Sequence, residues 1–497
     1  MSLPVLLPDA LRSTESGFAL RVSLPWIRSL PLASVADLGV VIDGEPVDVV
    51  VALERHRVAP SALVFESGWW FVQNRLVLEG RRMLRPGLRD VSVSFTLAVP
   101  YLQAGPAGPL TLPFRADAAL ALDASAEASG SAPSGTWSRH RILTPDPDAS
   151  AALIRDERVD PRPAIGEAGW DLGASAFNWT REVIRAERPA TDIAVGIVGS
   201  GIASTIEVEP GQLWRSFPQP SDAEIDALAA RLAGAGGRVS VVGGSLDDWA
   251  LPVRRRSLEE RAAFLEPQLR AAARLGARGV RVPFGQAGGE LLRRLQPVLA
   301  KLDVVLYEEI QGQQSLDVPG NAENLELLAS LDDPRIRVLI DISMLMPALP
   351  PSYLEELRAG GVGDALLDRL EDDWRSPQTH AAVLAALRGG EVPPAVHTLF
   401  MNLLVRFGRS SVADLEPLLP LTAGVHLKFW DLDDADRRVS RPIADIGAAL
   451  VRSGFRGTLT SEWGGNEWLG DDPAAMTRAH LALARRALAE ASVPSAH

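Results

Sequence analysis

The stretch Gly424-Val-His-Leu-Lys-Phe-Trp430 places two chemically active side chains two residues apart in an otherwise apolar run. Side chains alternate between the two faces of a β-strand, so residues two apart share a face. We therefore expect His426 and Lys428 to point to the same side of a strand. Both side chains then belong to one site.

Three other apolar runs end in a carboxylate, and these runs are 304–309, 338–341 and 458–462. The first ends in two acidic residues, Glu308 and Glu309, of which only one can face the same side as the other ligands. The pattern Glu309-Ile-Gln-Gly favours Glu309, which leaves Glu308 to face a helix or solvent. These runs and the stretch 424–430 each offer one ligand-type side chain at the carboxyl end of a strand.

The four side chains are Glu309, Asp341, His426 and Glu462. Three carboxylates and one imidazole suit a hard divalent cation such as Mn²⁺ or Mg²⁺, with coordination positions left for water and substrate. The sequence therefore predicts one metal site, with Mn²⁺ as the first choice. The competing interpretation is ordinary polarity of loops at strand ends.

Strands and amphipathic helices alternate along the second half of the chain, which is typical of a parallel sheet with crossover helices. We expect strands at 192–199, 238–243, 279–284, 303–309, 336–341, 424–430 and 458–462. An eighth strand comes either from Ala395 to Phe400 or from residues 137–190. Ligands at the carboxyl ends of several strands favour an α/β fold of the TIM (β/α)8 type. We assign this barrel to residues 191–497, with a helical insert at about 345–420.

Residues 1–120 show a different pattern, in which apolar and polar residues alternate and turn residues recur at short intervals. This pattern predicts an N-terminal all-β sandwich domain. The stretch from Ala116 to Thr136 is dominated by Ala, Ser, Gly and Pro, a composition that buries too little surface to fold. We assign residues 121–190 to a linker and connecting segment.

The composition excludes several functional classes. The 497 residues contain no cysteine, which excludes disulfides, thiolate metal sites and cysteine nucleophiles. A formal net charge of −13 argues against nucleic acid or an anionic membrane as a partner. We find no signal peptide and no apolar run long enough to span a bilayer, so we expect a cytoplasmic protein. Self-association into a homo-oligomer is expected for a barrel with an added sandwich.

The segment from Ile193 to Ser204 has the spacing of a dinucleotide-binding fingerprint, a strand followed by closely spaced glycines. Ser204 replaces the last glycine, and residues 207–210 interrupt the position where the fingerprint helix begins. A phosphate group bound there lacks its helix N-terminus. We therefore expect no dinucleotide cofactor.

Four motifs carry a resemblance to a known family, and they are Glu309-Ile-Gln, Ile340-Asp341, Val425 to Asp431 and Ser461-Glu-Trp-Gly-Gly465. Together they resemble the xylose-isomerase-like TIM barrels and, more narrowly, the large α subunit of bacterial C-glycoside deglycosidases. The resemblance implies that Glu309, Asp341, His426 and Glu462 hold a catalytic Mn²⁺. The N-terminal β domain looks like the small β subunit of the same enzymes, so the resemblance implies a natural fusion of both subunits.

This resemblance implies a metal-dependent lyase that cleaves the bond between sugar and aglycone in 3-keto-glycosides, by enolisation and β-elimination. The substrate then comes from a separate sugar 3-oxidoreductase, because this chain shows no redox cofactor site. One alternative is a metal-dependent sugar isomerase or epimerase that uses the same four ligands. Another is a carbohydrate-binding protein without catalysis. Intact ligands argue against the last alternative.

Three further residues are candidates for catalytic roles. Relatives commonly carry a histidine two residues beyond the first ligand, where this chain has Gln311, so the general base has moved or the substrate differs. An amide holds a sugar hydroxyl but takes no proton. Lys428 is a candidate donor to developing negative charge, with a solvated lysine at a strand end as the alternative. His397 is a second acid or base candidate, with a place in the core or on a helix surface as the alternative.

Overall fold

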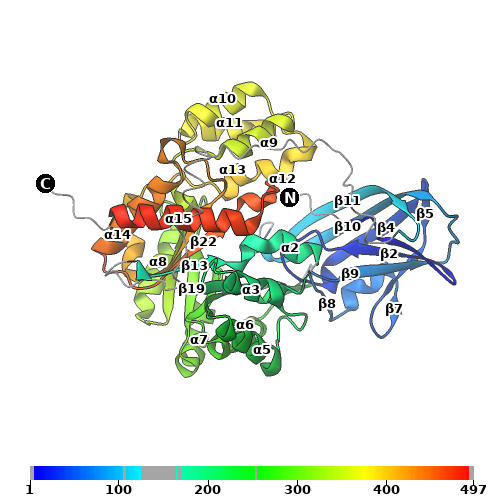
Figure 1. Cartoon of the computed structure of the whole chain (residues 1–497), viewed down its shortest axis with the longest axis horizontal. Coiled ribbons are helices and arrows are strands. Elements are labelled where there is room, and N and C mark those ends of the chain that lie inside the picture. Colours follow the sequence, from blue (N-terminus) through cyan, green and yellow to red (C-terminus); the bar gives the residue numbers. More distant parts are fainter. Residues whose placement is uncertain are drawn as a thin grey trace.

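The computed structural model describes residues 5–103, 108–124, 164–165, 170–186, 188–251 and 254–491. Figure 1 shows a β domain (blue and cyan) beside a barrel with helices around it, and the helices α9, α10 and α11 of an insert above the barrel. Most of the predicted linker lies outside the described residues.

Two antiparallel sheets form the N-terminal domain, with strand orders β1-β2-β9-β6-β7 and β11-β10-β4-β5. Strands β3 and β8 form a separate pair. Phe18 and Leu20 from one sheet and Val93 and Leu97 from the other are buried in one shared core, because apolar residues alternate along these strands. The bounds are β1 (Leu11–Thr14), β2 (Gly17–Ser23), β3 (Leu30–Pro31), β4 (Val35–Ile42), β5 (Glu45–Val47), β6 (Val49–Ala52), β7 (Arg57–Val58), β8 (Trp69–Trp70), β9 (Arg75–Gly80), β10 (Leu88–Gln103) and β11 (Pro109–Ala121).

Eight parallel strands form the barrel, as predicted, and pairing of β13 with β22 closes it. A short strand, β12 (Ala164–Ile165), pairs antiparallel with β13. The barrel strands are β13 (Trp170–Ser175), β14 (Thr205–Val208), β15 (Arg238–Gly243), β18 (Gly279–Pro283), β19 (Val305–Ile310), β20 (Ile336–Asp341), β21 (Thr422–Phe429) and β22 (Thr458–Trp463). A hairpin of β16 (Trp249–Leu251) and β17 (Arg254–Arg255) follows β15.

The predicted strand at 192–199 is wrong, because this segment is helix α3 (Ala190–Gly199). Its buried residues, among them Ile193, Ala194, Ile197 and Val198, recur at helical spacing. A short apolar run fits a buried strand and a buried helix equally well when periodicity is the only guide. The helix also removes the strand that a dinucleotide fingerprint requires.

The first two barrel strands are therefore β13, from the region 137–190, and the four-residue strand β14. The other source considered for an eighth strand, Ala395 to Phe400, is wrong: His397–Phe400 forms helix α12 after a 3-10 turn at Pro394–Val396.

Crossover helices surround the barrel. Ser221 and Ser257 cap the N-termini of helices α5 and α6. Their hydroxyls accept hydrogen bonds from the backbone N–H groups of Glu224 and Glu260 in capping boxes. Outside the insert, the helices of the described residues are α2 (Thr180–Arg185), α3, α4 (Pro210–Leu213), α5 (Asp222–Gly234), α6 (Leu258–Leu275), α7 (Gly288–Leu302), α8 (Pro319–Leu331), α14 (Ser440–Arg452) and α15 (Pro473–Ala491).

The long connection between β20 and β21 is helical. It contains α9 (Pro351–Ala359), α10 (Asp364–Asp372), α11 (Pro377–Arg388), α12 (His397–Phe400) and α13 (Asn402–Val405), followed by 3-10 turns at Ala413–Leu421. Its own apolar core includes Tyr353, Phe400 and Phe407. The same core includes Trp430 and Trp463, which lie at the ends of β21 and β22. The insert is thereby fixed to the carboxyl ends of these two strands.

The β domain docks on the carboxyl ends of β14 and β15. Arg28 donates through Nη2 to Oδ1 of Asp247, which follows β15, at 2.5 Å, and both side chains are buried. The Ser29 hydroxyl donates to the carbonyl of Gly211, which follows β14, at 2.6 Å. The mouth of the barrel therefore lies between the β domain and the insert.

Candidate metal centre

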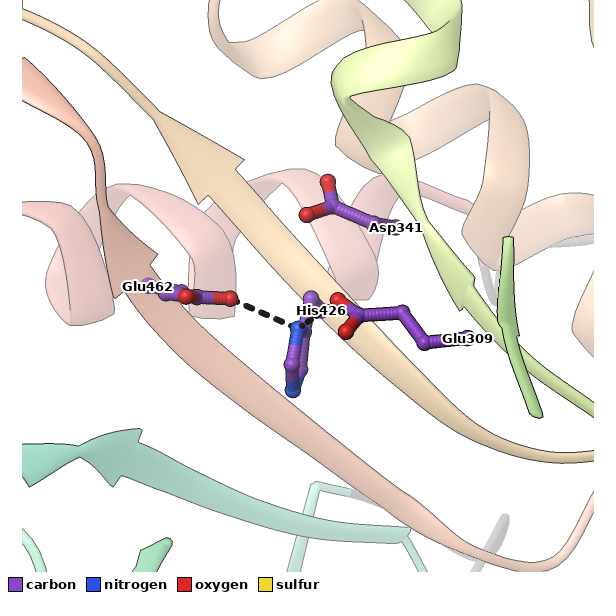
Figure 2. A group of neighbouring side chains, drawn as sticks. All are labelled: Glu309, Asp341, His426 and Glu462. Carbon is purple, nitrogen blue, oxygen red and sulfur yellow. Dashed lines mark ion pairs between the residues drawn. The ribbon is translucent and has the colours of Figure 1, made fainter. Parts of the chain in front are cut away.

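The four predicted ligands come together at the carboxyl end of the barrel. Glu309 lies on β19, Asp341 at the end of β20, His426 on β21 and Glu462 on β22. Each offers one ligand atom, and these atoms lie within 4.8 Å of one another. All four side chains are buried, and Figure 2 shows them converging from neighbouring strands.

The register of the strands explains this convergence. Asp341 pairs directly with His426 across β20 and β21, and Lys428 pairs with Glu462 across β21 and β22. Both His426 and Lys428 contact the Glu462 carboxylate, through Nδ1 at 2.6 Å and Nζ at 3.2 Å. The prediction that these two residues share one face of the strand is confirmed.

Carboxylates surround the imidazole of His426. Its Nδ1 lies 2.8 Å from Oε1 of Glu309 and 2.6 Å from Oε2 of Glu462, and its Nε2 lies 2.9 Å from Oε2 of Glu207. Burial lowers the pKa of His426, but the three carboxylates outweigh burial and raise this pKa well above its ordinary value. The position therefore favours positive charge at Nδ1, the side on which the ligand atoms converge.

Oδ2 of Asp341 is buried at the centre without a hydrogen-bond partner. Buried polar atoms normally find partners, so this oxygen beside the three other ligand side chains fits a bound cation. The donor set of oxygens and one imidazole nitrogen suits a hard divalent ion. Burial raises the pKa of Asp341 to about 6, because it removes the water that stabilises the carboxylate.

Arg281 and two further carboxylates complete the site, and sequence reasoning missed all three. Arg281, on β18, donates through Nη1 to Oε2 of Glu309 at 2.8 Å and also pairs with Glu207 and Glu209. Glu207 lies on β14, and its role as a partner of Nε2 of His426 orients the imidazole so that Nδ1 faces the ligands. The alternation in Thr205-Ile-Glu-Val was the available signal.

The charges at the mouth do not balance. Glu207, Glu209, Glu309, Asp341 and Glu462 give five negative charges when ionised, and Arg281 and Lys428 give two positive charges. With a neutral imidazole the cluster carries three excess negative charges. A divalent cation compensates two of them, so its binding is electrostatically favoured.

Glu308 faces away from the ligands, as predicted. Its Oε2 accepts from Nδ2 of Asn324, on α8, at 2.6 Å and from the backbone N–H of Gly285 at 3.0 Å. Alternation along β19 thus separates the two neighbouring glutamates. Glu309 serves the centre, and Glu308 ties the strand to its helix.

Lys428 is held inside the site, which contradicts the alternative of a solvated lysine. Its side chain is 7% exposed, and Nζ lies 5.5 Å from the ring centre of Trp430 and 5.9 Å from that of Phe177. Lys428 lowers the pKa of Glu462, which falls well below its ordinary value although burial acts in the opposite direction. The ammonium group therefore stays close to the ligands.

Among the described residues, neither of the other two catalytic candidates forms a hydrogen bond or ion pair with the four ligands. Gln311 is exposed just after β19, and its backbone N–H donates to the Gln314 side chain at 2.9 Å. His397 is exposed at the start of α12, and no contact of the described residues joins it to the ligands. A motif around His397 was absent from the sequence, and its exposure agrees with the alternative of a helix surface.

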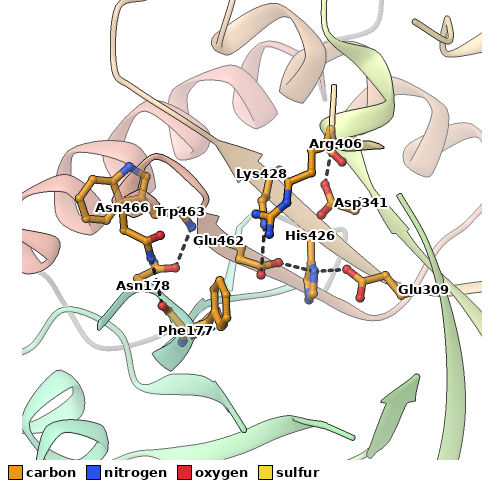
Figure 3. A network of polar contacts seen from close by, with 12 residues as sticks. Phe177, Asn178, Glu309, Asp341, Arg406, His426, Lys428, Glu462, Trp463 and Asn466 are labelled. Carbon is orange, nitrogen blue, oxygen red and sulfur yellow. Dashed lines mark hydrogen bonds and ion pairs between the residues drawn. The ribbon is translucent and has the colours of Figure 1, made fainter. Parts of the chain in front are cut away.

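Hydrogen bonds at the end of β22 fix the position of Glu462. The Trp463 N–H donates to Oδ1 of Asn178 at 2.7 Å, and Nδ2 of Asn178 donates to the carbonyl of Ser461 at 3.3 Å. Asn178 lies just after β13, so it closes the barrel at this end. Figure 3 shows this network together with Arg406, which enters from the insert and pairs with Glu467.

The aromatic residues after β14 pack against the β domain. Phe217 is buried, and its ring lies 4.9 Å from that of Trp69. Trp214 is buried as well, and the Arg215 guanidinium lies 5.8 Å from the ring centre of Phe71. This part of the barrel's carboxyl-terminal face holds the two domains together.

No family model matches the chain. It is 28% identical over 339 residues to the C-glycoside deglycosidase α subunit of Arthrobacter globiformis, which covers 67% of this chain and 96% of that subunit. A 3'-dehydrocarminate deglycosidase α subunit of Microbacterium is 26% identical over 337 residues, 64% of this chain and 95% of that subunit. The chain is therefore similar to proteins named deglycosidase α subunits over almost their full length.

The β subunit of the Microbacterium 3'-dehydrocarminate deglycosidase also matches, with 29% identity over 103 residues, 20% of this chain and 78% of that subunit. One chain thus resembles sequences that these deglycosidases carry on two subunits. Among solved structures, a 3-keto-D-glucoside 4-epimerase from E. coli is 15% identical with a TM-score of 0.35, over 64% of this chain and 99% of that chain. At this score the likeness carries no weight for function. None of the described helices is long and apolar enough to cross a membrane.

Proposed function

We propose that the chain is a metal-dependent lyase that releases the aglycone from 3-keto-glycosides by enolisation and β-elimination. The observation that supports this most is the convergence of four buried ligand side chains beside the ammonium group of Lys428. The similarity to proteins named deglycosidase α subunits also supports this function. Mn²⁺ is the proposed ion, with Mg²⁺ as the second choice.

When bound, a divalent ion supplies Lewis acidity that stabilises negative charge developing on the substrate's ketone oxygen. Glu207 keeps Nδ1 of His426 turned toward the centre, and Arg281 keeps Glu309 in place. Lys428 faces the same space and carries protons that a departing aglycone can take. The chain's own residues thus orient the ligand side chains and provide the acid.

A 3-keto sugar has to be made by oxidation, and the described residues form no dinucleotide fingerprint. We therefore assign that step to a separate sugar 3-oxidoreductase. This part of the proposal fails if the purified chain cleaves a glycoside that has not been oxidised.

The test measures bound metal and aglycone release from a 3-keto-glycoside for the wild type, Glu462→Gln and Glu259→Gln. Glu259 is exposed on α6 and serves as the matched control. We expect stoichiometric Mn²⁺ and aglycone release in the wild type and the control. Glu462→Gln removes a charged ligand and is expected to lose the metal and about 10³-fold in rate, because Lewis-acid stabilisation contributes several kcal/mol.

Bound metal without aglycone release from any tested 3-keto-glycoside contradicts the lyase and moves the assignment to a sugar isomerase or epimerase. Absence of metal from the wild type after incubation with Mn²⁺ or Mg²⁺ contradicts the metal centre itself. A sugar-binding barrel is then the remaining interpretation.

A further inference from the structure

Glu209 is a carboxylate of the cluster that neither belongs to the predicted ligand set nor contacts His426. It follows β14 directly, and its Oε1 accepts from Nη2 of Arg281. The carboxylate occupies space above Gly243 at the end of β15, where an added Cβ would lie 2.0 Å from Oε1. A glycine at position 243 is therefore needed for Glu209 to fold into the mouth of the barrel.

One guanidinium connects Glu209 to the metal centre. Arg281 donates through Nη2 to Glu209 and through Nη1 to Oε2 of Glu309 at 2.8 Å. Because Arg281 is nearly buried, this double contact fixes Glu209 beside the ligand Glu309. In the described part of the chain, the second oxygen of Glu209 has no hydrogen-bond partner. That oxygen is available to a substrate.

Glu209 is also the most open carboxylate of the cluster. Its side chain is 15% exposed, whereas those of Glu207, Glu309 and Glu462 are 0%, 4% and 6% exposed. The other candidates for a base are committed or unsuitable: ligand carboxylates face the cation position, and the amide of Gln311 takes no proton at neutral pH. Lys428, held as an ammonium between carboxylate and rings, is suited to give a proton.

We propose that Glu209 is the general base of the enolisation step. This inference rests on the proposed function. The base takes the proton from C2 of the 3-keto sugar, and the electrons of that C–H bond form the C1=C2 double bond. The bond from C1 to the aglycone breaks, and the leaving aglycone takes a proton from Lys428. The products are the free aglycone and a 1,2-unsaturated 3-keto sugar, so no oxidant or reductant is needed.

The electrostatics of the position agree with this role. Burial raises the pKa of Glu209 to about 7, Arg281 opposes this rise, and Glu207, Glu462 and Glu309 add to it. A base is most effective when its pKa lies near the working pH, because it is then both deprotonated and basic enough. A glutamate on the surface has a pKa well below neutral pH, so it is a weaker base than Glu209.

The experiment compares wild type, Glu209→Gln and the control Glu259→Gln, all loaded with Mn²⁺. Two rates are measured on a 3-keto-glycoside: aglycone release, and exchange of the C2 proton in D₂O followed by NMR. We expect Glu209→Gln to lose about 10²- to 10⁴-fold in both rates, with metal content and KM little changed. The acidic limb of the wild-type pH profile should vanish in the variant.

A second variant, Glu209→Ala, distinguishes loss of the base from a change in folding. Added formate is expected to restore part of its C2 exchange, which a merely structural role of Glu209 does not allow. The proposal is overturned if Glu209→Gln keeps wild-type exchange, or if the loss follows loss of metal and formate restores nothing. If the wild type exchanges C2–H but releases no aglycone, the lyase assignment fails and the base assignment stands.

Discussion

The two halves of the barrel mouth differ in what they contribute. Strands β19 to β22 carry the four ligands and Lys428, whereas β14 to β18 carry Glu207, Glu209 and Arg281. The first half offers atoms to a cation, and the second half sets the orientation and charge of those atoms. This difference shows that the ligands predicted from a sequence also need side chains that orient them and balance their charge.

Each half is also covered by a different part of the chain. The insert packs on the ligand half, where Nε2 of Gln313 donates to the carbonyl of Leu403 at 3.1 Å. Gly312 has a φ of 57°, and a Cβ there would lie 2.2 Å from the carbonyl oxygen of Val405. The β domain packs on the other half through Arg28 and Asp247. The two halves can therefore be perturbed separately.

The largest effect is expected in the ligand half, from Lys428→Met. Loss of the proposed acid should lower the rate of aglycone release by about 10²- to 10⁴-fold, because a positioned proton donor contributes this much. Metal content should persist, since Lys428 is not a ligand. The matched control is Lys301→Met, an exposed lysine on α7. A rate equal to that of the control would assign Lys428 to charge compensation alone.

A smaller effect is expected in the other half, from Glu207→Gln. The amide no longer provides a charged partner for Nε2–H of His426, so affinity for Mn²⁺ should fall about 10- to 100-fold. Excess metal should restore much of the activity, which separates this residue from the ligands. Calorimetric titration of the metal-free protein measures the change. An unchanged dissociation constant would show that Glu207 does not orient the imidazole.

The smallest effect on catalysis is expected at the domain contact, from Arg28→Met. The change leaves Asp247 buried without its ionic partner, which should cost about 3–5 kcal/mol in the free energy of unfolding. Activity per folded molecule should change little, because Arg28 lies outside the cluster. Urea unfolding measures the loss, and Arg28→Met combined with Asp247→Leu should recover much of it. Equal instability of the single and double variants would contradict this account.

The sequence predicted the ligand half well and the other half poorly, for physical reasons. Each ligand ends a distinct apolar strand, so alternation alone indicated its face. Glu207 and Glu209 belong to a strand of only four residues, and the preceding apolar run was taken for a strand although it is helix α3. Arg281 lies at an interior position of β18. Its three acidic partners come from β19 on one side and from β14, beyond β15, on the other, so only the order of strands in the sheet brings them together.

His397 illustrates a limit of prediction from residue type alone. A histidine is chemically versatile wherever it occurs, so its type alone says little about its location. The structure leaves it exposed on the insert. Lys428, in contrast, was predictable because it shares a strand face with a ligand.

The docked β domain has a consequence for assembly. Two such domains on separate chains have to meet by diffusion, so a complex between them depends on protein concentration and on equal supply of both chains. Covalent connection replaces that encounter with a high effective local concentration. The ratio of the two parts is then fixed at synthesis, and dilution of the cell extract does not separate them.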